Sequence, residues 1–296
     1  MADTRCAGTI VVLGSINMDL VTTTGRLPKP GETLLGNTFS TVPGGKGANQ
    51  AIAAAKAGGQ VRFAGAVGDD DFGDRLRAAL VEGGVSVDLL RKIRGPSGIA
   101  SITVDDTAEN TIVVVAGANG SITELLPGEQ DAVRRSALLV CQLEIPLEAV
   151  ISAVGIAAAA GVLVMLNPSP ARDLPAALLD GVSVLVLNEG EATAIGRDCL
   201  AQVAHVVTTL GAAGAHYRGP QADFSVSAPT VAAVDTTGAG DAFTGALAVA
   251  WNDGNDPRAA LEYACAAGGL ATTRAGASSS SPTAAEIDEL VAATYR

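Results

Sequence analysis

Short apolar runs alternate with alanine-rich runs along most of the chain, and this alternation constrains the fold more than any other feature. The apolar runs are nearly continuous, as expected for strands that are covered on both faces. Alternation of strands and helices predicts an α/β fold, a three-layer sandwich in which helices cover both faces of a mainly parallel central sheet. Strands are expected at 9–13, 61–66, 137–141, 162–166, 182–187 and 205–208, and helices at 47–57, 72–81, 147–160, 239–251, 257–273 and 284–293.

Two pairs of strand-like runs break this alternation, because neither pair leads directly into a helix. We expect them to form a small separate β-sheet that acts as a lid, with its strands within about 17–43 and 97–117. No low-complexity linker interrupts the chain, so residues 1–296 are expected to form a single α/β domain. The strand-like runs are 19–24 and 34–41 in the first pair, and 98–104 and 111–116 in the second.

The charge of the chain argues against some classes of partner. Lys and Arg number 19 against 31 Asp and Glu, which gives a formal net charge of −12. Proteins bind nucleic acid largely through Lys and Arg on the phosphates, and the chain has no basic run, so we expect neither nucleic acid nor a membrane surface as a partner. A phosphorylated ligand would need backbone amides, bound cations or a few basic side chains to offset the repulsion.

The cysteines and the apolar segments predict the cellular compartment of the protein. The four cysteines are far apart in the sequence and form no CxxC motif, which fits a reducing cytoplasm. The uncharged stretch 150–166 is shorter than the roughly 20 residues of a membrane span and is expected to be a buried helix followed by a buried strand. With no signal-peptide pattern at the start, a cytoplasmic protein is expected. The cysteines are Cys6, Cys141, Cys199 and Cys265.

The strongest local motif is DTTGAGDAF at 235–243, which follows a β-type run at 230–234 and enters a helical run. Its glycines let the backbone approach a ligand, and the free amides of Ala239, Gly240 and Asp241 would point at one spot at the positive end of the helix dipole. Such an arrangement binds phosphate without a basic side chain. Asp241 is then a candidate proton acceptor. The alternative is that Asp241 only favours the helix dipole and that the glycines only form a turn.

Two further motifs carry polar side chains suited to a ligand with many hydroxyls. In the glycine-rich helix start GGKGANQ at 44–50, Lys46 and Asn49 lie three residues apart and share a helix face. After the first strand, Asn17 and Asp19 point the same way in an extended chain, where a carboxylate can accept from two neighbouring hydroxyls. The alternatives are a helix start with a solvated lysine and an ordinary strand end.

Polar residues also follow three other predicted strands. Glu144 lies where open α/β sheets bind ligands, although a solvent-facing glutamate is the alternative. Asn188 and Glu191 have the spacing of a helix capping box, and they could also lie near phosphates and hold hydrated Mg²⁺. The segment 209–214 either lies along a nucleotide or forms a simple turn. The chain has neither a GxxxxGK[ST] loop nor a dinucleotide fingerprint.

Together these motifs resemble the ribokinase family of carbohydrate kinases, over about 11–287. The resemblance implies ATP-dependent phosphorylation of D-ribose at O5 to ribose 5-phosphate, with Asp241 as the catalytic base and the amides of Ala239, Gly240 and Asp241 as an anion hole. It also implies a homodimer formed through the lid. The motifs that carry the resemblance are GSINMD (14–19), PGE (30–32), GGKGANQ (44–50), GDDDFG (68–73), AGAN (116–119), QLE (142–144), LNPSPAR (166–172), NEGE (188–191), TLGAAG (209–214), DTTGAGDAF (235–243) and TRAGA (273–277).

The resemblance further implies roles for single residues. Mg²⁺ would accompany ATP, positioned through water by Glu191, and a monovalent cation, usually K⁺, would lie beside the anion hole. The sugar-binding residues would be Asn17, Met18, Asp19, Gly45, Lys46, Gly47, Ala48, Asn49, Glu144 and Asp241. The ATP-binding residues would be Asn188, Thr209, Leu210, Gly211, Ala212, Ala213, Gly214, Gly240, Asp241 and Cys265. The potassium positions would be Asp235, Thr237, Ala271, Arg274, Gly276 and Ser280, mostly through backbone carbonyls.

The sequence departs from the family pattern at two places. Cys265 stands near the expected adenine site, where the family usually has Asn or His, and a thiol is a weak hydrogen-bonding group, so the base preference is open. The segment 196–206 is shorter than the family norm.

Other functions remain as alternatives: a kinase for deoxyribose or another pentose or keto sugar, a nucleoside kinase, and a non-catalytic sugar-binding regulator. A nucleoside kinase needs an apolar surface for the base, and Phe39 is the only aromatic residue of the predicted lid strands.

Overall fold

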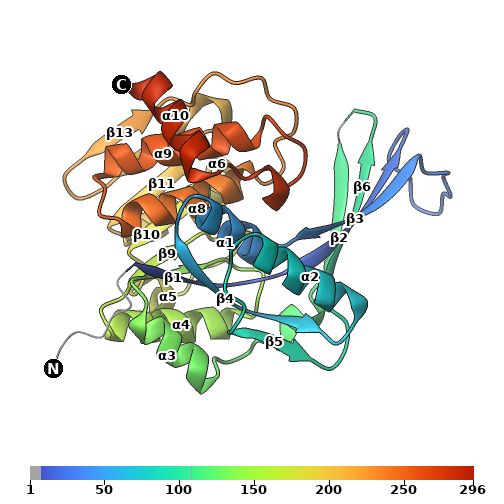
Figure 1. Cartoon of the computed structure of the whole chain (residues 1–296), viewed down its shortest axis with the longest axis horizontal. Helices are drawn as coiled ribbons and strands as arrows, with labels where there is room; N and C mark the ends of the chain where they lie inside the picture. The colour runs from blue at the N-terminus through green and yellow to red at the C-terminus, as the bar shows by residue number, and fades with distance from the viewer. Residues whose placement is uncertain (1–7, 108) are drawn as a thin grey trace.

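The computed structural model of the chain contains two β-sheets (Figure 1) and describes residues 8–107 and 109–296. Cys6, and Ala108 between the strand-like runs 98–104 and 111–116, lie outside the described residues. The larger sheet is parallel except for two antiparallel strands at one edge. Its nine strands are, in spatial order, β13 (Asp223–Val226), β12 (Ala215–Arg218), β11 (His205–Thr209), β10 (Val184–Asn188), β9 (Leu163–Leu166), β8 (Leu138–Cys141), β1 (Thr9–Leu13), β4 (Gln60–Gly68) and β5 (Leu90–Ile93).

Helices cover both faces of this sheet (Figure 1), as the sequence predicts for a three-layer sandwich. Along β1, Ile10 and Val12 pack into the core under one helical layer, whereas Val11 and Leu13 pack into the core under the other. The first layer is α1 (Lys46–Lys56), α2 (Asp71–Glu82), α8 (Ala239–Asn252), α9 (Pro257–Ala271) and α10 (Ala284–Tyr295); the second is α3 (Pro127–Arg135), α4 (Leu147–Ala159), α5 (Ala176–Leu179), α6 (Glu189–Ile195) and α7 (Arg197–Leu200). Three 3₁₀ helices are η1 (Gly117–Ser121), η2 (Gly211–Ala213) and η3 (Ser278–Ser280).

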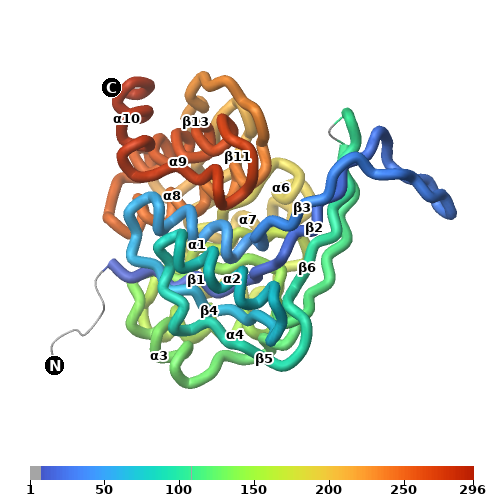
Figure 2. The backbone as a smooth tube through the Cα atoms, turned by 45° about the vertical axis from the view of Figure 1, so that its right-hand side comes forward, coloured from blue at the N-terminus to red at the C-terminus, as the bar shows by residue number. Residues whose placement is uncertain are grey.

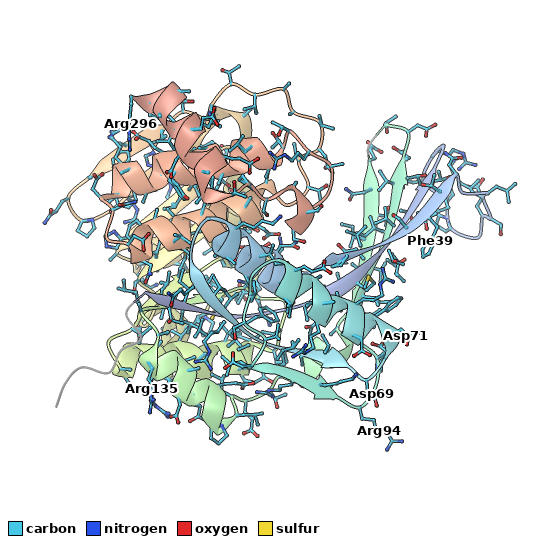
Figure 3. The ribbon with its side chains drawn as sticks, viewed as in Figure 1. Phe39, Asp69, Asp71, Arg94, Arg135 and Arg296 are labelled. Atoms are coloured by element: carbon cyan, nitrogen blue, oxygen red, sulfur yellow. The ribbon has the colours of Figure 1, made fainter. Side chains whose placement is uncertain are left out.

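The smaller sheet projects from this body, on the right-hand side of Figures 1 and 2. Its outer part is exposed: every residue of its last strand is exposed, and Phe39 lies on the projecting part, away from the helices (Figure 3). Its base is buried where Asn17 pairs with Gly44 and Gly98. The strands are, in spatial order, β3 (Thr38–Gly44), β2 (Asn17–Thr24), β6 (Gly98–Asp105) and β7 (Asn110–Val115), with β2 and β6 parallel and the other pairs antiparallel.

Two sequence predictions about strands were wrong. The β-type run 230–234 forms no strand, because its backbone is engaged elsewhere: the amide of Val234 donates to the carbonyl of Thr272, next to the end of α9, at 2.7 Å. The strand expected at 34–41 exists as β3, but its first four residues were placed wrongly: the register with β2 begins at Thr38, and Leu35 is almost fully exposed.

The uncharged stretch 150–166 contributes to α4 and then to β9, as the sequence predicts. Among the described residues, no helix combines the length and the hydropathy that crossing a membrane requires.

Asp70 joins the start of α2 to the segment that enters β6. Its Oδ1 accepts from the amide of Gly73 at 2.8 Å and from the hydroxyl of Ser97 at 2.6 Å, and its Oδ2 accepts from the amide of Ser97 at 2.9 Å. Burial alone raises the pKa of Asp70, but these hydrogen bonds outweigh burial and hold the pKa below its ordinary value. Asp70 therefore stabilises the base of the four-stranded sheet in its ionised form.

Replacing Asp70 by Ala is expected to lower the free energy of unfolding by about 1–3 kcal/mol at pH 7, because the variant loses a helix cap and leaves the donors of Ser97 unpaired. A carboxylate with a lowered pKa in the folded state stabilises above its unfolded pKa, and this stabilisation is lost as the pH falls through the folded pKa. Denaturant unfolding should thus show the difference shrinking below about pH 4. Asp71→Ala, at the neighbouring exposed position, should cost less, and a pH-independent loss in Asp70→Ala would contradict this account.

Candidate active site

Three carboxylates and one ammonium group gather where helices α1 and α8 meet the base of the four-stranded sheet. Asp241 lies in the first turn of α8, and Lys46 begins α1. Asp19 lies in β2, and Glu144 follows β8. The charges of Glu144 and Asp241 act on Asp19, and the charge of Lys46 acts on Asp241, so the structure brings together four residues that the sequence analysis singled out separately.

Asp19 is the carboxylate that this arrangement perturbs most clearly. Burial, followed by the negative charges of Glu144 and Asp241, raises the pKa of Asp19 to about 7. Its carboxylate occupies the space beside Gly44, where a Cβ atom would lie 2.2 Å from Oδ2. A group of hydrogen-bond donors, such as sugar hydroxyls, would relieve the unfavourable concentration of acceptors here.

Glu144 is held in place by two donors rather than facing solvent. The hydroxyl of Ser15 donates to its Oε2 at 2.5 Å, and the amide of Lys46 donates to the same oxygen at 3.0 Å. The other oxygen, Oε1, is left to accept from a ligand. Ser15 was not singled out from the sequence, although it belongs to the GSINMD motif.

Asn17 is buried and is oriented by a second asparagine that sequence reasoning missed. The Nδ2 of Asn119, in η1, donates to Oδ1 of Asn17 at 2.8 Å and to the carbonyl of Ile16 at 3.0 Å. The amide of Ile16 donates to Oδ1 of Asn119 at 3.0 Å, which fixes the orientation of Asn119. Asn17 can therefore offer its own Nδ2 as a donor to a ligand.

Four other predicted sugar-binding residues contribute backbone rather than side chains. Met18 and Ala48 are packed in the hydrophobic core. The amides of Gly47 and Ala48 donate to the hydroxyl and the carbonyl of Ser15, at 3.4 and 2.9 Å. Gly45 precedes α1 with a φ of +90°, a conformation that favours glycine. Gly45, Gly47 and Ala48 therefore shape the start of α1, whereas Met18 belongs to β2.

Helix α8 begins at a residue that must be glycine. Gly238 has a φ of +74°, and a Cβ atom there would lie 2.7 Å from the Cα of Ala277. Such a contact is closer than van der Waals packing allows, and the left-handed conformation disfavours other residues as well. Gly238 therefore allows the first turn of α8 to lie against the loop that contains Ala277.

The three amides of the expected anion hole differ in whether they have a hydrogen-bond partner. The amide of Ala239 donates to the carbonyl of Thr236 at 3.2 Å. The amides of Gly240 and Asp241 have no hydrogen-bond partner in the part of the chain that the structure describes. These two amides lie at the positive end of the α8 dipole, next to the Asp241 carboxylate, and unpaired amides at such a position favour an anion.

The Asp241 carboxylate is held by two carboxamides of α1. Gln50 Nε2 donates to Oδ1 at 2.9 Å, and Asn49 Nδ2 donates to Oδ2 at 3.0 Å. Burial raises the pKa of Asp241, and the charge of Lys46 and these two hydrogen bonds reduce the rise without cancelling it. The Oδ1 of Asn49 is buried and has no partner in the described structure, so a hydroxyl of a bound sugar would supply one.

Two cavities lie at the first turn of α8, and Asp241 lines the smaller of them. One, of about 140 Å³, is lined by Lys46, Asn188, Glu191 and Asp241 among others. The other, of about 560 Å³, is lined mainly by apolar groups and is bounded by Cys265. Thr209 and Gly240 line both cavities, so the two cavities are neighbours beside the unpaired amides of α8. The predicted nucleotide residues that border the larger cavity are Thr209, Gly211, Ala212, Gly214, Gly240 and Cys265.

Asn188 and Glu191 form the capping box that their spacing predicts. Asn188 Oδ1 accepts from the amide of Glu191 at 2.8 Å, and Glu191 Oε2 accepts from the amide of Asn188 at 2.9 Å. Both residues also line the smaller cavity, so the structural interpretation and the functional one are compatible.

Three of the six predicted potassium residues are joined by one carboxylate. Asp235 accepts from the amide of Thr237 through Oδ1 and from the amide of Gly276 through Oδ2, both at 2.9 Å. Although burial raises the pKa of Asp235, these hydrogen bonds outweigh burial and lower it. Of the other three, Arg274 pairs with Glu286, and Ala271 and Ser280 are buried.

The variant Asp19→Asn is expected to be more stable than the wild type at pH 8, by roughly 2–4 kcal/mol, and to bind sugar less well. Because the folded protein raises the pKa of Asp19 from 3.8 to about 7, it binds more protons than the unfolded chain between these values. Stability therefore falls as the pH rises through this interval, and the variant does not share this fall.

Unfolding by denaturant at pH 8, 6 and 4 measures the effect. The advantage of Asp19→Asn should shrink below pH 7 and disappear near pH 4, whereas Asp106→Asn, at an exposed turn of the small sheet, should behave like the wild type. Equal stability of Asp19→Asn and the wild type at pH 8 would refute the proposed charge cluster.

Comparison with known proteins places this site in a family context. Residues 7–284 match the model of the pfkB family carbohydrate kinases. A ribokinase of Bacillus subtilis is 39% identical over 290 residues, which cover 95% of this chain and 99% of that protein. A deoxyribokinase of Salmonella typhi is 34% identical over 298 residues, which cover 95% of this chain and 97% of that protein.

A solved structure shares both the large and the small sheet. The structure of Arabidopsis thaliana ribokinase complexed with ribose and ATP superimposes with a TM-score of 0.90 at 32% identity, over 96% of this chain and 99% of that one.

Proposed function

The chain belongs to the pfkB family of carbohydrate kinases, and on that premise we propose that it transfers the terminal phosphoryl group of ATP to O5 of D-ribose, giving ribose 5-phosphate and ADP. The observation that carries this proposal is the juxtaposition at the start of α8. There the Asp241 carboxylate adjoins two amides without a partner, those of Gly240 and Asp241. This neighbourhood of a carboxylate and unpaired amides, beside two cavities that Gly240 lines, supports the roles of proton acceptor and anion hole.

The sugar would bind among the polar groups at the base of the small sheet. Asp19 and Glu144 Oε1 would accept from hydroxyls, and Nδ2 of Asn17 and the Lys46 ammonium would donate to them. Asn49 would contribute its unpartnered Oδ1. A site that is built to hydrogen-bond hydroxyls rejects analogues that lack one, because its buried polar groups are then left unpaired.

The role of Asp241 follows from the acidity of the groups involved. Burial raises the pKa of Asp241, but an alcohol with a pKa near that of water, about 15.7, remains far less acidic than the carboxyl group. Full deprotonation of the sugar before attack is therefore uphill. In a loose transition state the transferring phosphoryl group carries most of the charge. The amides stabilise that charge, and Asp241 aligns the hydroxyl and receives its proton late.

The residues present are compatible with Mg²⁺ and with a monovalent cation. Glu191 supplies one carboxylate to the smaller cavity, and Mg²⁺ in nucleotide sites typically uses one or two carboxylates together with phosphates and water. Bound Mg²⁺ neutralises phosphate charge. Asp235, by tying Thr237 to Gly276, holds together part of the segment proposed to bind K⁺ through backbone carbonyls. A cytoplasmic location stays a prediction.

Phosphorylation of 2-deoxy-D-ribose is the second candidate, because one relative of similar identity is a deoxyribokinase. Ribose is the first candidate because the ribokinase of Bacillus subtilis is 39% identical to this chain, whereas the deoxyribokinase is 34% identical. Phosphorylation of a nucleoside is disfavoured, since Phe39 lies away from the helices that form the site (Figure 3).

The variant Asp241→Asn is expected to lower kcat by about 10²–10⁴-fold or more with little change in KM for D-ribose, because it removes the proton acceptor. ADP release should be measured for both proteins with D-ribose, 2-deoxy-D-ribose, hexoses and nucleosides, in K⁺ and in Na⁺. The proposal expects the highest kcat/KM with D-ribose and a higher rate in K⁺. A near-normal kcat in Asp241→Asn would exclude its assigned role, and a preference for another sugar would exclude ribose.

We further propose that the protein is a homodimer formed through the small sheet. The paired positions Asp19, Ala100 and Val114 lie on one face, and Val21, Ile102 and Ile112 continue that face outward. Ile112 and Val114 are 51% and 52% exposed. An exposed apolar face and an open edge strand are costly in a monomer, and a second copy of the sheet would cover both.

The variant Ile112→Asp is therefore expected to be a monomer, because it places a charge in the apolar face that the partner covers. Analytical ultracentrifugation of the wild type, of Ile112→Asp and of the control Thr111→Asp, on the opposite face of β7, measures this. The wild type and the control should sediment as dimers. A monomeric wild type, or a dimeric Ile112→Asp, would contradict the proposed interface.

A further inference from the structure

Behind Asp241 lies a chain of three buried carboxamides to which the sequence motifs assigned no role. They belong to Gln50, Gln142 and Asn167, which are 1%, 0% and 9% exposed. Gln50 Nε2 donates to Asp241 Oδ1 at 2.9 Å and to Asn167 Oδ1 at 3.0 Å. Gln142 Nε2 donates to Gln50 Oε1 at 2.6 Å. The side chain of Gln50 thus uses both donor hydrogens and its acceptor.

This chain allows only one orientation of the Gln50 carboxamide. Asn167 Nδ2 donates to the carbonyl of Val186 at 2.9 Å, so its Oδ1 must face Gln50. If the Gln50 carboxamide were rotated by 180°, its oxygen would face two other oxygens, and its nitrogen would face the nitrogen of Gln142. The oxygens of Asn167 and Asp241 therefore fix the direction in which Gln50 donates, and Gln142 supplies the donor that the Gln50 oxygen needs.

Gln142 carries a cost that this role explains. Its Oε1 is buried and has no hydrogen-bond partner in the described structure. Gly14 provides the space for this oxygen, since a Cβ atom at Gly14 would lie 2.0 Å from it. A buried acceptor without a partner is destabilising, and an apolar side chain at position 142 would avoid the penalty. The only hydrogen bond of the Gln142 side chain in the described structure is the one that it donates to Gln50.

We infer that Gln50 and Gln142 are positioning residues for the phosphoryl transfer: Gln142 holds the side-chain oxygen of Gln50, and Gln50 binds Oδ1 of Asp241 so that Oδ2 faces the sugar hydroxyl. The two oxygens have different surroundings. Oδ2 contacts Asn49, a predicted sugar residue, whereas Oδ1 contacts Gln50, which lines neither cavity beside Asp241. This inference rests on the proposed function, because it assigns Asp241 the role of proton acceptor.

The variants Gln50→Leu and Gln142→Leu test it through kcat, KM and the pH dependence of kcat. Gln50→Leu should lower kcat roughly 10- to 100-fold, because a hydrogen bond to a charged group is lost. Gln142→Leu, which does not touch Asp241, should have a smaller effect in the same direction. In both, KM for D-ribose should change less than about twofold, and the acid limb of the kcat profile should move to higher pH, because a carboxylate with fewer donors is protonated more easily.

Ser136→Ala is the matched control for the loss of a buried hydrogen bond. Ser136 is 1% exposed, its hydroxyl donates to the carbonyl of Val133 at 2.8 Å, and it precedes β8 at the end opposite to the site. This variant should lower Tm without changing kcat or its pH profile. If Gln142→Leu keeps the wild-type kcat and pH profile, or if Ser136→Ala changes them equally, the positioning role is overturned.

A measurement without substrates separates this inference from the proposed function. The carboxyl band of Asp241, identified by infrared difference spectroscopy against Asp241→Asn, reports the protonation of Asp241 as a function of pH. The band should titrate at higher pH in Gln50→Leu and Gln142→Leu than in the wild type. An unchanged titration overturns the inference even if D-ribose is phosphorylated. A shifted titration in a protein that phosphorylates no sugar would overturn the proposed function while the hydrogen-bonded positioning of Asp241 stands.

Discussion

The contact between helices α1 and α8 at Asp241 is the interaction on which the rest of the site depends. Asn49 and Gln50 of α1 donate to the two oxygens of the Asp241 carboxylate at the start of α8. Asp241 lies 192 residues after Asn49 in the sequence. Since the same turn of α8 carries the free amides, the contact sets the position of the proposed proton acceptor relative to both the proposed sugar-binding residues and the proposed anion-binding amides. Gly245 of α8 makes this close approach possible, because a Cβ atom there would lie 2.7 Å from the carbonyl oxygen of Gln50.

The site is charged in a way that folding alone would not favour. Asp19, Glu144 and Asp241 act on one another, and burial together with this repulsion raises the pKa of both Asp19 and Asp241. Three supporting side chains donate hydrogen bonds within the site: Ser15 to Glu144, Asn119 to Asn17, and Gln142 to Gln50. This arrangement of carboxylates lowers the free energy of unfolding, and hydrogen bonds from sugar hydroxyls would offset the loss. Such a balance is expected of a pre-organised binding site.

The sequence predicted the layers well and the supporting contacts poorly. Continuous apolar runs such as that of β1 show both the strand and its burial, and the helix after Gly238 follows from its motif. The run 230–234 misled because β-branched residues indicate a strand only where a neighbouring strand can pair. Gln142 offered a usable signal, since a single amide within an apolar strand run must find a partner when buried, but only the fold shows that the partner is Gln50. Likewise, the hydrogen bond between Asn119 and Asn17 joins residues far apart in the sequence, so the sequence alone could not predict it.

The central claim is that the amides of Gly240 and Asp241 hold the phosphoryl group during its transfer, while the Asp241 carboxylate directs the sugar hydroxyl. A crystal structure of the protein with D-ribose and a non-hydrolysable ATP analogue tests it most directly. We expect an oxygen of the terminal phosphate within hydrogen-bond distance of both amides and the ribose O5 within hydrogen-bond distance of Asp241 Oδ2. A terminal phosphate bound away from the first turn of α8, with O5 out of reach of Asp241, would contradict the account.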